Sequence, residues 1–114
     1  MNAVLQREMN TTIVVSRETA RHLESLPLIP SDVDSKLRSL LEAEYRRRLS
    51  RYSLTDRMLQ QKYGMTYEEF EVRNVVEERG YSWEVESDAI AWETASDGMR
   101  TMQRKLQELL GPKP

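Results

Sequence analysis

A chain of 114 residues is long enough for one domain, or for one small domain with an appended interaction segment. It has no cysteine, which excludes disulfides, thiolate metal sites and cysteine nucleophiles. Charged residues make up 32% of the chain, which favours helices with solvated faces. Because no apolar run suits a signal peptide or a membrane span, we expect a cytoplasmic protein with no membrane contact.

The net charge of −2 conceals a gradient along the chain. Residues 1–62 carry a net charge of +3, and residues 63–114 carry a net charge of −5. We therefore expect residues 1–62 to form an N-terminal element for dimerisation, which on one hypothesis also binds DNA. We expect residues 63–114 to form an acidic helical segment that binds a partner. The alternative is that basic and acidic side chains are simply solvated and happen to be concentrated in different halves of the chain.

The first predicted element is a short strand at Asn10–Ser16 (NTTIVVS), because residues 11–15 are all β-branched. The sequence has no second convincing strand, and a single strand cannot satisfy its own hydrogen bonds. Pairing with another copy of the chain is the economical solution, so we expect a homodimer.

Helices are predicted for most of the remaining chain. Ser16 is a candidate N-cap for a short helix to about Leu26, and a capping pair at Ser31 and Asp34 opens a long helix whose apolar stripe continues to Tyr52. Further start and stop signals predict three more helical segments, with these boundaries: Ser53 to Gly64, Thr66 to Gly80, and about Ser87 to Gly111. The expected fold is mainly α, with a short N-terminal strand followed by four to five helices.

The order of strand, short helix and longer helix is also that of half a ribbon-helix-helix fold. In that fold two chains pair their strands, and the resulting ribbon enters the DNA major groove. On this hypothesis Asn10 and Thr12 share the face that reads bases. The segment YRRRLSRY contains four arginines, Arg46, Arg47, Arg48 and Arg51. On this hypothesis they bind DNA phosphates. Two alternatives are that they are solvated or that they pair with the acidic half of the chain. The strand has no Lys or Arg, which departs from the pattern.

Neither a catalytic site nor a metal site is indicated. The single histidine, His22, follows Glu18 by four residues, which suits a local surface pair. The carboxylates lack the Glu-x-x-His spacing of helical metal sites, and the four glycines are too far apart for a phosphate loop. We therefore expect no enzyme activity and no cofactor.

Both tryptophans lie in the most acidic stretch, residues 75–93 (VVEERGYSWEVESDAIAWE), which contains six carboxylates. Trp92 continues a helical apolar stripe and is expected in the core. Trp83 precedes the expected helix start in an extended or turn-like stretch, so its ring should be partly exposed. One interpretation is a core helix with a charged outer face; the other is a docking segment whose partner-binding residues are Tyr81, Trp83, Glu84, Glu86 and Asp88.

Residues Leu54 to Leu109 resemble small archaeal and bacterial proteins that are encoded beside putative toxins and regarded as antitoxin components. The resemblance rests on KYGMTYEEF (Lys62 to Phe70), GYSWEVESD (Gly80 to Asp88) and AWETASDGM (Ala91 to Met99), about half of the chain. It implies an N-terminal dimerising, often operator-binding element and a C-terminal segment that neutralises a toxin, often a small basic RelE-like ribonuclease.

The leading hypothesis is therefore an antitoxin that binds a basic toxin directly and represses its own operator. The alternative is a stand-alone DNA-binding transcriptional regulator without a toxin partner, and a structural helical adaptor is a third reading.

Overall fold

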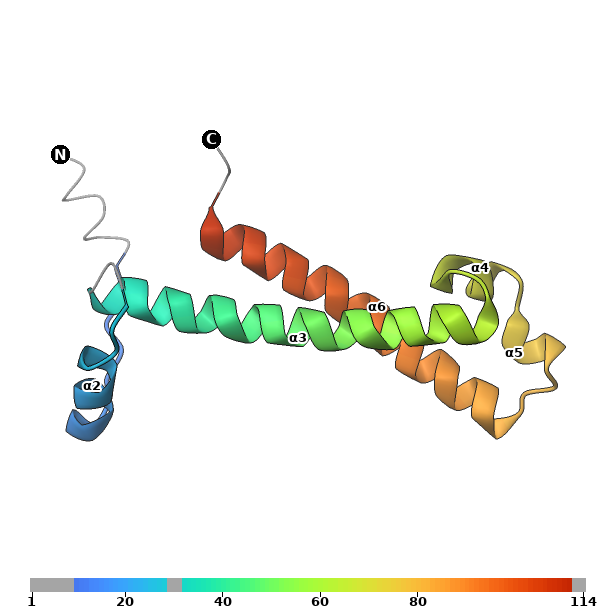
Figure 1. Cartoon of the computed structure of the whole chain (residues 1–114), viewed down its shortest axis with the longest axis horizontal. Coiled ribbons are helices and arrows are strands. Elements are labelled where there is room, and N and C mark those ends of the chain that lie inside the picture. The colour runs from blue at the N-terminus through green and yellow to red at the C-terminus, as the bar shows by residue number, and fades with distance from the viewer. Residues whose placement is uncertain (1–9, 29–31, 112–114) are drawn as a thin grey trace. The chain divides into compact units, whose positions relative to one another are not determined.

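The computed structural model describes residues 10–28 and 32–111, and it is mainly helical (Figure 1). The fold class is thus mainly α, as predicted. By its internal packing the chain divides into two compact units between Leu37 and Arg38, within one long helix. The predicted division after residue 62 concerns function, and it stays a prediction.

The first unit contains helix α2 (Arg17–Glu24). The Ser16 side chain accepts a hydrogen bond from the Thr19 backbone N–H at 3.1 Å, which confirms the predicted cap. The ammonium of the buried Lys36 donates to the Glu24 carbonyl oxygen at 2.7 Å. A lysine is well suited to that position, because the last carbonyls of a helix lack intrahelical donors.

The strand predicted at Asn10–Ser16 is not formed, and no residue that the structure describes belongs to a strand. The physical reason is the missing partner, since a strand needs a second strand for its backbone groups and the chain offers none. Its apolar side chains Ile13, Val14 and Val15 are exposed instead. A ribbon-helix-helix dimer is consequently not supported by the fold of the single chain.

Helix α3 (Val33–Tyr63) is continuous, so the predicted restart at Ser53 is wrong. The Asp56 carboxylate lies within the helix and accepts hydrogen bonds from the side chains of Gln60 and Trp92, both at 2.8 Å. The helix ends at Gly64 as predicted, with a left-handed φ of 66°.

Two short helices follow, α4 (Tyr67–Val72) and α5 (Val75–Glu78), where the sequence predicts one. The Thr66 cap is confirmed, since its hydroxyl accepts from the Glu69 N–H at 3.2 Å. The break comes at Asn74, whose φ of 57° is left-handed and incompatible with a continuous helix.

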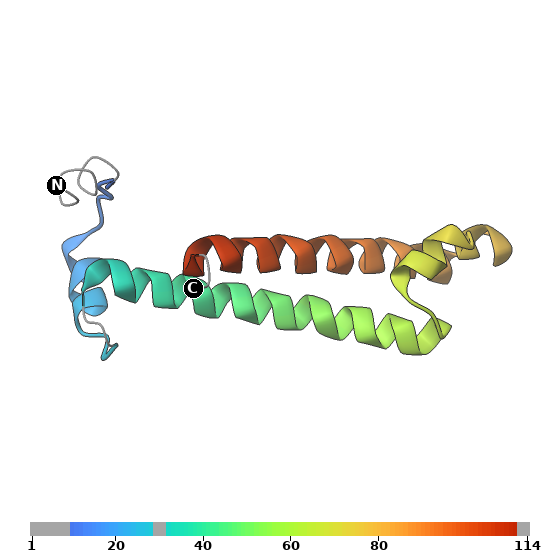
Figure 2. The ribbon, with the colours of Figure 1, turned by 90° about the horizontal axis from the view of Figure 1, so that it is seen from above.

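The last helix, α6 (Trp83–Leu110), starts at the Ser82 cap, five residues before the predicted start at about Ser87, and ends at Gly111. It runs antiparallel to the second half of α3, and α4 and α5 lie at the end of the hairpin where the chain turns back (Figures 1 and 2). The two long helices approach closely at Gly98, where an added Cβ would lie 2.4 Å from the Tyr52 ring.

An aromatic cluster forms the core of this second unit. Trp92 is fully buried, as predicted, and its ring centroid lies 5.0 Å from that of Phe70, 5.6 Å from Tyr67 and 5.9 Å from Tyr63. Such aromatic pairs add about 0.5–1.5 kcal/mol each beyond the area that they bury. The core cluster consists of Leu59, Tyr63, Phe70, Val75, Val85 and Trp92. It fixes α4, α5 and the first half of α6 against the end of α3.

Candidate partner-binding site

The turn from α5 into α6 positions the predicted docking residues. The Gly80 N–H donates to the Glu77 carbonyl and the Tyr81 N–H donates to the Val76 carbonyl, both at 2.9 Å. This pair of bonds is a Schellman motif, for which Gly80 supplies the left-handed residue with a φ of 69°. Ser82 then caps α6, so the turn leaves Tyr81 and Trp83 on either side of the cap.

Trp83 is 82% exposed and Tyr81 is 60% exposed. The predicted partial exposure of Trp83 is therefore confirmed. Its predicted location is wrong, because Trp83 is the first residue of α6 and follows the cap. Ser82 has no Glu or Gln three residues later, so the stronger sequence signal of a capping box is missing at this helix start.

Trp83 begins a row of side chains on the outer face of α6, opposite the residues that α6 buries. Successive members are three or four residues apart, which places them on one side of a helix. We call this row the outward stripe; it consists of Trp83, Glu86, Ile90, Glu93 and Asp97. Two large apolar side chains, Trp83 and Ile90, therefore lie among three carboxylates over about four turns.

Two of the predicted partner-binding carboxylates are engaged within the chain. The Lys62 ammonium donates to Glu84 at 2.7 Å and to Asp88 at 2.6 Å, and the Tyr63 hydroxyl donates to Asp88 at 2.5 Å. Burial raises the pKa of Asp88, but the hydrogen bonds from Lys62 and Tyr63 more than offset it, so the pKa lies below its usual value. Burial, with the Asp88 hydrogen bond, raises the pKa of Tyr63 to about 12. This network ties α3 to α6, and Glu86 is the predicted carboxylate left on the outer face.

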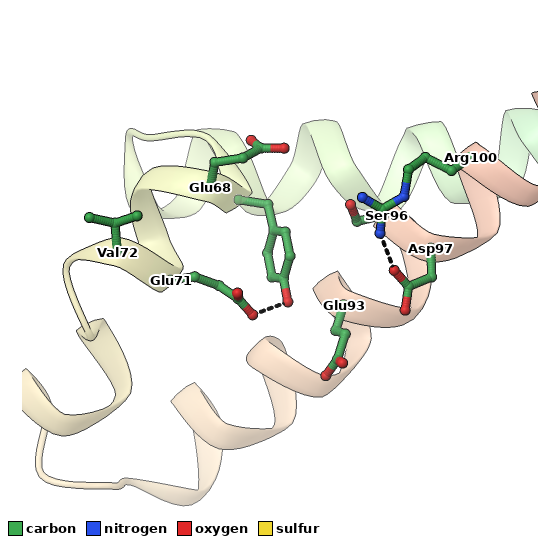
Figure 3. Close-up of a pocket in the computed structure, with 8 residues that line it drawn as sticks. Glu68, Glu71, Val72, Glu93, Ser96, Asp97 and Arg100 are labelled. Atoms are coloured by element: carbon green, nitrogen blue, oxygen red, sulfur yellow. Dashed lines mark hydrogen bonds and ion pairs between the residues drawn. The ribbon is translucent and has the colours of Figure 1, made fainter.

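The far end of the outward stripe borders a hollow of about 400 Å³ between α4 and α6 (Figure 3). Glu68 and Glu71 reach it from α4, and Glu93 and Asp97 reach it from α6. Asp97 pairs with Arg100. Four carboxylates against one arginine make the hollow acidic. Sequence reasoning missed Ile90, Glu93 and Asp97, although their spacing from Trp83 would have found them once the helix start was placed at Ser82.

Tyr67 lines this hollow, and burial and the surrounding carboxylates raise the pKa of its hydroxyl. Burial raises the pKa of Tyr67 well above its ordinary value, and the hydrogen bond that its hydroxyl donates to Glu71 adds to the effect. The charges of Glu71, Glu93 and Asp97 raise the same pKa further. Their fields therefore converge on one place, which suits a cationic group better than an anionic one.

The predicted DNA-binding residues fall in different units. Asn10 and Thr12 are exposed in the first unit, whereas the arginine cluster lies on α3 in the second. Three of the arginines pair with glutamates of their own helix, and these pairs are Arg46–Glu42 at 2.8 Å, Arg47–Glu44 at 2.8 Å and Arg48–Glu44 at 2.7 Å. The Arg47 hydrogen bond, followed by that of Arg48, lowers the pKa of Glu44 to about 2. These partners lie on the same helix and not in the acidic half of the chain, and the three arginine side chains are more than half exposed.

Comparison with known proteins identifies no relative. No protein-family model matches the chain, and neither a curated protein nor a solved structure matches it. No helix in the described ranges is both long enough and apolar enough to cross a membrane. The fold and the surface of this chain are therefore the basis for a functional proposal.

Proposed function

We propose that this chain is a non-enzymatic antitoxin, which neutralises a small basic toxin by direct binding and needs no cofactor. The observation that carries the proposal is the outward stripe, where Trp83 is 82% exposed and Ile90 is 67% exposed between carboxylates. The resemblance of residues 54–109 to antitoxin components supports the same function.

The composition of the stripe suits a protein interface with a basic partner. Tryptophan is enriched among the few residues that dominate binding energy, because it buries a large rigid surface when a partner covers it. The flanking carboxylates Glu86 and Glu93 would accelerate encounter with a positively charged protein. A toxin that acts on RNA carries positive charge where its substrate binds, and an acidic stripe can occupy that region.

The proposal is tested by co-expression with the product of the neighbouring reading frame, which we expect to be a small basic protein, followed by capture and calorimetry. We expect Trp83→Ala to weaken binding by about 2 kcal/mol or more, roughly 30-fold. Met58→Ala is the matched control, because Met58 is a large exposed apolar residue on α3, away from the stripe. Unchanged binding by Trp83→Ala would refute the docking role of the outward stripe, and no capture by the wild-type chain would refute the antitoxin assignment.

Operator binding by a homodimer is the second part of the proposal. Residues 11–15 carry exposed β-branched side chains just before α2, and this is the segment that a second copy would pair with. The ribbon would then present Asn10 and Thr12 to bases. Phosphate binding by the α3 arginines must displace Glu42 and Glu44, at small cost because these ion pairs are exposed to solvent.

Light scattering and a DNA-binding titration test this second part. A dimer whose DNA affinity falls steeply with salt, and is lost on replacing Arg46, Arg47 and Arg48 by alanine, is the expected result. A monomer at micromolar concentration contradicts it. DNA binding without capture of any toxin would favour the alternative, a stand-alone transcriptional regulator.

A further inference from the structure

Tyr81 has a left-handed backbone, with a φ of 56°. Among the described residues it shares this property with three glycines and with Asn74. Glycine adopts the conformation freely, and asparagine tolerates it; Asn74 also uses its side chain to donate to Glu77 at 3.2 Å. A bulky aromatic residue is an outlier there.

The turn itself does not require a tyrosine. A Schellman motif needs one left-handed residue, and Gly80 already provides it. In many such motifs the residue after the glycine buries an apolar side chain against the preceding helix, which would compensate its strain. Tyr81 remains 60% exposed, and in the described part of the chain its side chain makes no hydrogen bond and no aromatic pair. Among the described residues, the strain is therefore not offset by a side-chain hydrogen bond or an aromatic pair of Tyr81.

From this uncompensated strain we propose that Tyr81 is a binding residue of the docking site, held in a costly backbone conformation that presents its ring beside Trp83 to a basic protein partner. The inference rests on the proposed function. A phenol ring next to exposed carboxylates recognises a lysine or arginine side chain through its π-face. The free chain thus gives up stability that the bound complex regains, as strained residues at functional sites do.

The test has one arm on the free protein and one arm on the complex. In the free protein, Tyr81→Gly and Tyr81→Asn remove the ring and release the backbone strain. Tyr81→Ala removes the ring as well, but the backbone strain remains. We expect the melting temperature of Tyr81→Gly and Tyr81→Asn to exceed that of Tyr81→Ala by about 4 °C or more. Equal melting temperatures for all three variants would overturn the inference.

In the complex, the probe is the protein that the neighbouring reading frame encodes, which we expect to be small and basic. We expect Tyr81→Gly to bind this protein at least tenfold more weakly than wild type, although Tyr81→Gly melts at a higher temperature than Tyr81→Ala. Tyr81→Phe should bind it within about threefold of wild type. Undiminished binding by Tyr81→Gly, in a system where Trp83→Ala binds poorly, overturns the role of Tyr81 and leaves the antitoxin assignment standing. No binding by the wild-type chain refutes the assignment itself.

Discussion

Replacing Trp92 by alanine tests whether the aromatic cluster holds the second unit together. The side chain is 0% exposed, and its ring packs against the rings of Tyr63, Tyr67 and Phe70. Truncation of a fully buried tryptophan costs about 3–5 kcal/mol, because transfer energy is lost and a cavity remains. The indole N–H that donates to Asp56 at 2.8 Å is lost as well, which places the expected cost at the upper end of that range.

Urea unfolding followed by circular dichroism measures this cost, with Trp83→Ala as the matched control. Trp83 is largely exposed, so its removal should change the free energy of unfolding by no more than about 0.5 kcal/mol. Each variant keeps a single tryptophan, and we expect blue-shifted emission from Trp92 and solvent-like emission from Trp83. Equal destabilisation by the two substitutions, or a cost below about 1 kcal/mol for Trp92→Ala, would refute the description of the core.

Three further predictions concern the contacts around α3. Gly98→Ala places a Cβ 2.4 Å from the Tyr52 ring, so urea unfolding should show that the free energy of unfolding falls by about 1–3 kcal/mol. The helix propensity of alanine alone would raise the free energy of unfolding, and such a rise would contradict the close approach of the two helices. The pKa of Asp88 is lowered in the folded chain, so its stabilising contribution is present above the unfolded pKa of 3.8 and is lost as pH falls through the lower folded value. Asp88→Asn should therefore flatten the acid limb of stability against pH, and an unchanged limb would show that the network with Lys62 is not formed. The Glu44 carboxyl should titrate near 2 by NMR and move upward in an Arg47→Gln, Arg48→Gln variant; titration at its ordinary value in the wild-type chain would exclude the pairing.

Local signals predicted the helices well where one residue type is strongly favoured. Ser16 and Thr66 each accept the backbone N–H that a capping residue should accept, and Gly64 and Gly111 end their helices. The burial of Trp92 followed from helical spacing alone. These features depend on neighbours within four residues, so the sequence contains what is needed.

Boundaries set by tertiary contacts were not predictable in the same way. Ser82 and Ser87 are both acceptable helix starts by residue type, and the contacts of Lys62 with Glu84 and Asp88 select the earlier one, because both carboxylates must lie on one helical face. The Ser53 restart failed for the same reason. Asp56 is occupied by a residue 36 positions away, which no local pattern reveals.

The outward stripe was only partly accessible to sequence reasoning. Trp83 and Glu86 were found from composition, whereas Ile90 and Glu93 become neighbours of Trp83 only when the helix begins at Ser82. The strand failed differently: the β-branched run from Thr11 to Val15 has the propensity for a strand, but pairing depends on a second chain.

The antiparallel hairpin of α3 and α6 also sets the order in which the second unit assembles. Lys62 and Glu84, near the α4–α5 end, are 22 residues apart in the chain, whereas Tyr45 and Lys105 near the open end are about 60 residues apart. Closing the longer loop first costs about 0.9 kcal/mol more in chain entropy. The hairpin should therefore zip from the α4–α5 end toward the C-terminus of α6, which would be the last part to fold and the first to fray.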